Sequence, residues 1–89
     1  MSYDELRPEF VEFVPENLEQ GVLYVSMEYE TAVHLCACGC GAKTVTPFGS
    51  WQDSWSLTND QGLVTLSPSI SNYQMACKAH YFIEANRVR

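Results

Sequence analysis

The sequence predicts a mostly β fold of about seven short strands around one metal site. No segment of the 89 residues keeps a helical period of apolar side chains for more than two turns. Instead, short runs of β-branched and aromatic residues alternate with proline, glycine and polar turn residues. Cysteine and histidine gather in two groups, which is the layout of a structural metal site. A chain of this length is expected to form a single metal-binding β domain that spans residues 1–89.

Three strands are expected in the first half of the chain. In order, they are Phe10–Val14, Val22–Ser26 and Thr31–Leu35. Pro15 ends the first of them, because proline has no amide hydrogen to donate to a sheet. Glu16–Gln20 is expected to form one helical turn that ends at Gly21. The third strand leads directly into the cysteines.

The second half of the chain is expected to form hairpins. The expected strands are Lys43–Thr46, Trp55–Thr58, Leu63–Leu66, His80–Glu84 and Arg87–Arg89. Asn59–Gly62 has the composition of a four-residue hairpin turn between the second and third of these strands. Ala85–Asn86 is expected to turn the chain between the last two strands. Ser67–Met75 has no strand pattern, and we expect it to be a loop.

The charge balance excludes some classes of partner. Five basic residues stand against 11 acidic ones, which gives a net charge of −6. A nucleic-acid binder needs a basic patch, and so does a protein that docks on anionic lipid. The N-terminus lacks the features of a signal peptide, and no apolar stretch is long enough to span a membrane. We therefore expect a cytoplasmic protein. The acidic residues of the first third form either a solvated face or a docking surface for a basic partner.

Two groups of residues can ligate a metal ion. The first contains His34, Cys36, Cys38 and Cys40, and the second contains Cys77 and His80. Structural zinc is held by four thiolate or imidazole ligands in a tetrahedron. The compartment disfavours disulfides, and a core that is thin at this size gains stability from a metal. The two groups therefore predict a zinc site.

The sequence leaves the choice of ligands open. We favour Cys38, Cys40, Cys77 and His80, because the glycines that follow Cys38 and Cys40 allow the chain to bend around an ion. Cys36 is a close competitor that can replace either Cys38 or Cys40 as a ligand. His34 is expected to hydrogen-bond behind the ligands or to lie in the core. Aromatic residues are expected to pack over the metal, namely Trp51, Trp55, Tyr73, Tyr81 and Phe82.

An iron–sulfur centre is the alternative to zinc. A Rieske-type [2Fe-2S] cluster takes two cysteines and two histidines, a count that the two groups can supply. The fold is accordingly expected to be zinc-ribbon-like or Rieske-like. The sequence lacks the motifs of zinc deaminases, metalloproteases and phosphate-binding loops, and metal ligation would occupy the cysteines. We therefore expect no catalytic residues and no enzyme activity.

Residues 10–88 resemble a small bacterial family that combines Cys-x-Cys-Gly-Cys-Gly with Cys-x-x-His-Tyr. The residues that carry the resemblance are Glu12–Glu16, Gly21–Ser26, His34–Gly41, Val45–Pro47, Leu66–Ile70, Cys77, His80–Tyr81 and Arg87–Val88. Tyr81-Phe82 stands where Tyr-Trp is expected, which puts no ligand in doubt. Members of this family look like companions of bacterial ubiquitin-like conjugation genes.

This resemblance implies a function and a set of partners. The expected function is a non-catalytic, zinc-stabilised accessory or adaptor protein of a bacterial ubiquitin-like conjugation system, with a role in phage defence. The expected partner is an E1-like, E2-like or ubiquitin-like protein. The alternative is a Rieske-type redox protein.

Overall fold

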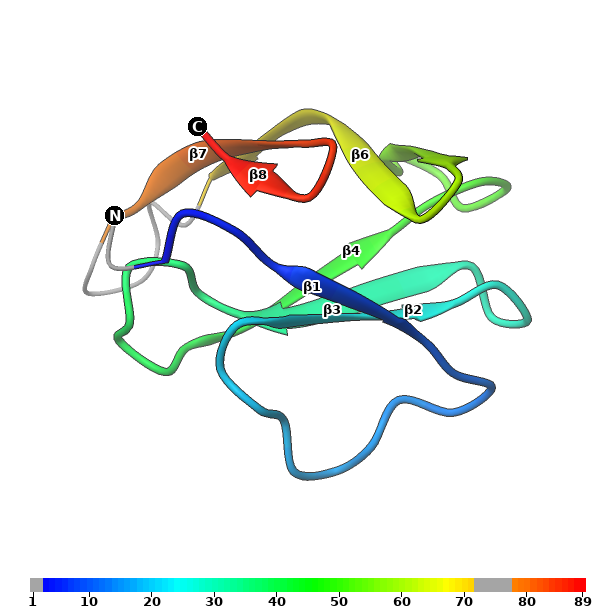
Figure 1. Ribbon diagram of the computed structural model, residues 1–89. Helices are drawn as coiled ribbons and strands as arrows, with labels where there is room; N and C mark the ends of the chain where they lie inside the picture. The colour runs from blue at the N-terminus through cyan, green and yellow to red at the C-terminus, as the bar shows by residue number, and fades with distance from the viewer. Residues whose placement is uncertain (1–2, 72–77) are drawn as a thin grey trace.

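The computed structural model describes residues 3–71 and 78–89, and these residues form two four-stranded sheets (Figure 1). The first sheet contains β1 (Arg7–Phe10), β2 (Val22–Ser26), β3 (Thr31–Leu35) and β4 (Lys43–Pro47). The second contains β5 (Ser56–Asp60), β6 (Leu63–Ser71), β7 (His80–Glu84) and β8 (Arg87–Val88). The prediction of a mostly β fold is confirmed, with eight strands where about seven were expected.

The strands of each sheet lie in chain order. In the first sheet, β1 pairs with β2 in parallel, and the other neighbours are antiparallel. The second sheet is antiparallel throughout. Two isolated bridges, Glu5 with Arg87 and Phe48 with Trp55, connect segments that belong to different sheets. Among the described residues, no helix is long and apolar enough to cross a membrane.

The core lies between the two sheets, which Figure 1 shows as two layers. Its fully buried side chains come from both layers, for example Leu23 and Val25 from β2 and Leu66 and Ile83 from β6 and β7. Alternate residues of a strand point to opposite faces, so one face of each sheet supplies these side chains. Removal of this apolar surface from water is the main stabilising contribution to a fold of this kind.

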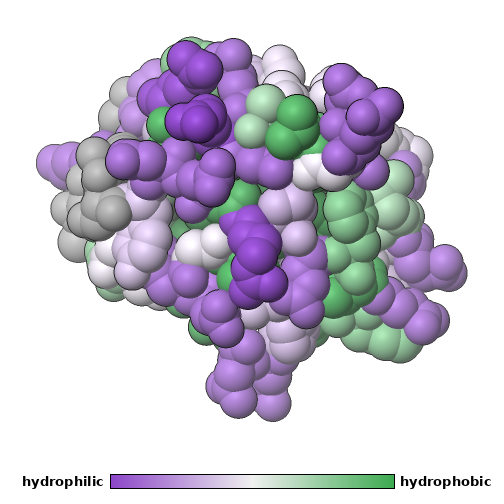
Figure 2. Space-filling model, in the orientation of Figure 1, coloured by the Kyte–Doolittle hydropathy of each residue, from purple (hydrophilic) through white to green (hydrophobic). Residues whose placement is uncertain are grey.

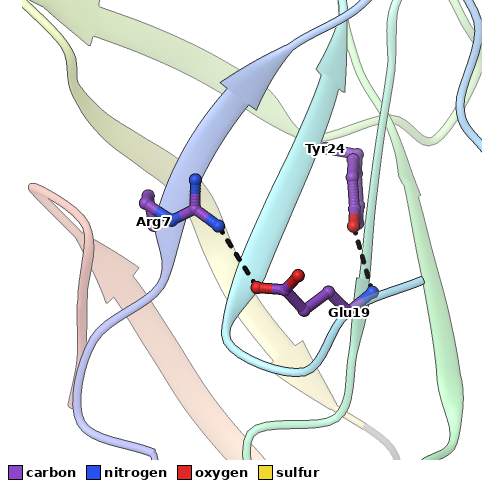
Figure 3. Close-up of polar contacts among 3 residues, drawn as sticks. All are labelled: Arg7, Glu19 and Tyr24. Atoms are coloured by element: carbon purple, nitrogen blue, oxygen red, sulfur yellow. Dashed lines mark hydrogen bonds and ion pairs between the residues drawn. The ribbon is translucent and has the colours of Figure 1, made fainter.

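Strand β2 is buried at all five of its positions. One face of β2 packs on the core, and the segment between β1 and β2 is tied to the strand. The Ser26 hydroxyl donates to the carbonyl of Glu12 at 2.7 Å, and the Tyr24 hydroxyl accepts from the amide of Glu19 at 3.0 Å (Figure 3). The ion pair of Arg7 with Glu19 contributes little, because their side chains are 65% and 70% exposed.

The first strand differs from the prediction. It spans Arg7–Phe10 instead of Phe10–Val14, and Glu16–Gln20 forms no helical turn. The reason lies in the tertiary contacts of this segment. The residues after Phe10 leave the sheet after one last bond, from the amide of Val11 to the carbonyl of Val25 at 2.9 Å. They then run beside β2, where Tyr24 and Ser26 bind their backbone groups.

The β5–β6 hairpin also differs from the prediction. Its turn has two residues, Gln61 and Gly62, instead of four, and both have positive φ, 53° and 91°. Two positive φ angles match the right-handed twist of the paired strands. Strand β6 continues to Ser71, although Ser67–Met75 was expected to be a loop. Its second half pairs with β7, which the local pattern does not reveal, and residues 72–75 lie outside the described residues.

Apolar residues are exposed at one end of the molecule. In the view of Figure 2, polar residues cover most of the visible surface, and apolar residues gather on its right-hand side. Tyr29, in the turn between β2 and β3, packs against Phe13 with ring centroids 5.5 Å apart. The indole of Trp51 donates to the carbonyl of Tyr29 at 3.1 Å. Trp51 therefore packs at this turn, and not over the metal as expected.

Candidate functional site

Three cysteines meet in the connection between β3 and β4. The sulfur atoms of Cys36, Cys38 and Cys40 all lie within 4.8 Å of one another, and those of Cys36 and Cys38 are 3.5 Å apart. Cys36 is buried, Cys38 is half-buried and Cys40 is exposed. Thiolates at adjacent corners of a zinc tetrahedron are separated by roughly 3.8 Å, given zinc–sulfur bonds of about 2.3 Å. This group can therefore hold a metal ion.

The backbone bends around these sulfurs as the glycine positions predict. Gly39 and Gly41 have φ of 91° and 83°, in the region that favours glycine. The amide of Cys36 donates to the carbonyl of Ala42 at 2.8 Å and closes the base of the loop. The amide of Gly39 donates to the carbonyl of Cys36 at 3.0 Å, which closes a tight turn inside it. The loop thus gathers the three thiols through local backbone geometry.

The other predicted ligands have different positions. Cys77 lies outside the described residues. His80 is exposed at the start of β7 and does not belong to the group of mutually close ligand atoms. Its Nε2 lies 2.8 Å from the hydroxyl oxygen of Ser69, within hydrogen-bonding distance. His80 thus has a serine beside it, a contact that the sequence did not predict.

A buried hydrogen bond lies behind the thiols. His34 is fully buried, and its Nε2 lies 2.6 Å from the hydroxyl oxygen of Tyr81. The same hydroxyl accepts from the amide of Ala37 at 3.4 Å. Within residues 3–71 and 78–89, Nδ1 of His34 has no hydrogen-bond partner. Burial lowers the pKa of His34 to about 4, so the ring is neutral at pH 7.

Tyr81 connects the thiol loop to the second sheet. Burial raises the pKa of its hydroxyl well above the ordinary value, and the nearby Cys36 and Cys38 raise it further. The hydroxyl therefore keeps its proton at neutral pH. Tyr81 is the neighbour of His80 in β7, so one strand contacts the thiol loop from its inner face and carries His80 on its outer face.

Ser69 lies where the pairing of β6 with β7 is irregular. Leu66 is opposite Ile83 and Ile70 is opposite Tyr81, so the register shifts between these pairs. Bulges of this kind re-aim side chains and are common beside active sites. The carbonyl of Ser69 accepts from the indole of Trp55 at 3.3 Å, which fixes the backbone of the serine. Ser69 lies beside His80, which is 11 positions later in the chain.

The outer face of the second sheet carries the remaining groups of this site. Ser71 is opposite His80 and is exposed, and the ring of Phe82 lies 5.9 Å from the ring of His80 between centroids. The described part of the chain contains no pocket.

These features define a small two-sheet β protein with a three-thiol cluster and a surface pair of a serine and a histidine, the two residue types that serve as nucleophile and base in serine hydrolases. Residues 10–89 match the family model described as "Bacterial ubiquitination-like system serine protease (BubE)", and the chain belongs to this family. No curated protein and no solved structure matches the chain significantly. The family links the chain to bacterial ubiquitination-like systems, as the resemblance implied.

The family corrects one prediction. The chain was expected to have no enzyme activity, but its family is described as a serine protease, so that expectation is wrong. Ser69 was not expected to be functional because Ser67–Met75 was interpreted as a loop, and His80 was expected to ligate the metal. No local motif marks Ser69. The only available signal was the group of serines at positions 67, 69 and 71 upstream of a histidine.

Proposed function

We propose that the chain is a serine protease in which Ser69 is the nucleophile and His80 is the general base. The observation that carries the proposal is the 2.8 Å distance between the Ser69 hydroxyl oxygen and Nε2 of His80. A serine hydroxyl is a weak nucleophile until a base within hydrogen-bonding reach accepts its proton. The description of the family as a serine protease supports the same assignment.

The reaction follows from this geometry. As the Ser69 oxygen attacks the scissile carbonyl carbon, its proton passes to Nε2 of His80. The bond between the carbonyl carbon and the leaving nitrogen then breaks, and His80 gives the proton to that nitrogen. Water attacks the acyl-enzyme with His80 as base, which releases the carboxylic acid and restores the Ser69 hydroxyl. In each half of the reaction, His80 accepts one proton and gives it up again, so its protonation state is the same at the end as at the start.

The substrate that we propose is a protein of the ubiquitination-like system, either a ubiquitin-like protein or a conjugate of one. The open surface around Ser69 supports a macromolecular substrate, because no pocket in the described residues encloses a small one. The family description supports a partner from this system. E1-like and E2-like partners stay predictions, as do a role in phage defence, a cytoplasmic location and a single domain over residues 1–89.

The thiol cluster is proposed to hold a structural zinc ion. Cys36, Cys38 and Cys40 would supply three ligands. Cys77 and His80 are the fourth-ligand candidates from the sequence, and the contact of His80 with Ser69 favours Cys77. Three clustered thiols without a histidine favour zinc over a Rieske centre, which needs two histidines.

Active-site labelling tests the protease proposal. A fluorophosphonate probe should label the wild-type protein on Ser69, and Ser69→Ala should abolish labelling. Ser67→Ala and Ser71→Ala are matched controls on the same strand and should keep it. His80→Ala should lower the labelling rate at least 100-fold, because general-base assistance is worth about that much. Labelling that survives in Ser69→Ala would show that the nucleophile is wrong.

The metal content of His80→Ala separates the two roles of this histidine. As a general base, His80 can be removed without loss of bound zinc. If the variant instead loses its zinc, His80 is a ligand, and the assignment of the base is wrong. Metal content is measured on the same purified samples by mass spectrometry of the element.

A further inference from the structure

The leaving group of the proposed reaction must lie against His80. After the serine has attacked, Nε2 of His80 gives its proton to the leaving nitrogen, so this nitrogen lies within hydrogen-bonding distance of the ring. Side chains next to His80 on the outer face of the second sheet are therefore placed to contact the leaving part of the substrate.

Phe82 is such a neighbour. It is two residues after His80 in β7, so both side chains project from the same face of the sheet. The two ring centroids are 5.9 Å apart, with an interplanar angle of 49°. Phe82 is nevertheless 47% exposed. A large part of the ring thus remains available to a substrate that already touches the histidine.

The ring stands on a fixed backbone. The amide of Phe82 donates to the carbonyl of Arg89 at 2.9 Å, and the amide of Arg89 donates back to the carbonyl of Phe82 at 2.9 Å. The neighbours of Phe82 in β7, Tyr81 and Ile83, are buried in the core. A side chain on a rigid strand loses little conformational freedom when a ligand covers it, which makes it a good subsite.

We propose that Phe82 forms the subsite for an apolar side chain on the leaving-group side of the scissile bond. The inference rests on the proposed function, because it assigns the leaving-group side from the role of His80. The ligand class is an amine or amino acid residue with an aliphatic side chain, such as leucine, in preference to glycine. One exposed ring on an open surface covers one or two methylene groups, which corresponds to a preference of about 5- to 10-fold.

Transfer of an acetyl group to amines tests this subsite without a known substrate sequence. With p-nitrophenyl acetate, the Ser69 oxygen displaces p-nitrophenolate and forms the acetyl-enzyme. Added leucinamide or glycinamide then competes with water for the acetyl group, which yields N-acetyl amide and the free Ser69 hydroxyl. The attacking amine occupies the position of the leaving amine, because aminolysis is the reverse of its departure.

The wild-type protein should form about 5 to 10 times more N-acetyl-leucinamide than N-acetyl-glycinamide at equal amine concentrations. Phe82→Ser should reduce this ratio to about one. Phe82→Leu should keep most of the ratio. Glu84→Ser, on the same strand and face but farther from His80, is the matched control and should behave as the wild type. Mass spectrometry measures both products.

The outcomes separate the two proposals. A protein that is acetylated on Ser69 but shows no preference for leucinamide, or keeps the preference in Phe82→Ser, overturns only the subsite. A fall in p-nitrophenolate release in Phe82→Ser, with the ratio unchanged, also overturns it, because Phe82 then positions His80. A protein that is not acetylated on Ser69 overturns the proposed function, and the subsite with it.

Discussion

Tyr81 illustrates how a single side chain serves both sheets. Its hydroxyl is hydrogen-bonded to His34 of the first sheet and accepts from Ala37 in the thiol loop. The ring contributes to the core, since Tyr81 is 1% exposed. A buried polar group that loses its partner costs more than the bond itself contributes, because it also loses its hydration. His34 depends strongly on Tyr81, because its Nδ1 already has no partner among the residues that the structure describes.

Tyr81→Phe should therefore destabilise the protein by about 1–3 kcal/mol, because both ring nitrogens of His34 are then buried without a partner. Tyr24→Phe is the matched control. Its hydroxyl accepts from the amide of Glu19 in a part-buried position, where water can replace it, so about 0.5–1 kcal/mol is expected. Urea unfolding of both variants measures the difference. Equal losses would contradict the role assigned to Tyr81.

At the scale of elements, the turns are specified by backbone conformation. The connection after β4 is held by Glu30, whose carboxylate accepts from the amide and the hydroxyl of Ser50. The carbonyl of Glu30 also accepts from the amide of Phe48 at 2.8 Å. Gly49 lies between these two residues with φ of 77°, and a Cβ on it would collide with the Glu30 carboxylate. Gly62 has φ of 91°, but a Cβ there would meet nothing within 4 Å.

These two glycines form a matched pair for mutation. Gly62→Ala should cost about 1–2 kcal/mol, the penalty of a left-handed conformation for a residue with a Cβ. Gly49→Ala should cost more, because it also displaces Glu30 from Ser50. In a Glu30→Ala background, Gly49→Ala should therefore cost no more than Gly62→Ala does. Thermal unfolding of Gly62→Ala, Gly49→Ala, Glu30→Ala and the Glu30→Ala/Gly49→Ala double variant measures this excess cost. An excess that persists without Glu30 would show that the collision is not its cause.

At the scale of the whole molecule, the thiol loop belongs to the core. Cys36 and Ala37 are buried in the same cluster as Tyr81 of β7 and Ala79, which directly precedes this strand. A metal that holds the loop therefore also holds the contact between the sheets. Metal binding of this kind is coupled to folding, and in small zinc domains it contributes on the order of 10 kcal/mol near neutral pH.

Removal of the metal should accordingly unfold or strongly destabilise the protein. Treatment with a chelator under reducing conditions is expected to lower the melting temperature by more than 15 °C, since 1 kcal/mol corresponds to about 4–8 °C in a domain of this size. Return of zinc should restore it. Cys40→Ser, which removes the exposed thiol and leaves the core unchanged, should weaken zinc binding in the same assay. A metal-free protein with an unchanged melting temperature would contradict the structural role.

Several elements could be predicted from the sequence. The bounds of β2, β3 and β7 agree with the expected strands, because each is a run of β-formers between turn residues. The bend at the cysteines follows from Gly39 and Gly41, which have the positive φ that the pattern implies. The first strand and the course of β6 could not be predicted in this way. Their backbone partners come from β2 and β7, which local composition does not specify.

A mostly β fold and a cluster of three thiols follow from the amino-acid sequence alone, because strand composition and closely spaced cysteines act over a few residues. The contact between Ser69 and His80, in contrast, arises from the tertiary structure. They are 11 positions apart, and their contact depends on the pairing of β6 with β7. Register is a property of the packed sheet, since a shift of one residue turns every side chain of a strand to the opposite face. The chemistry of the site was therefore accessible only after the strands had been paired.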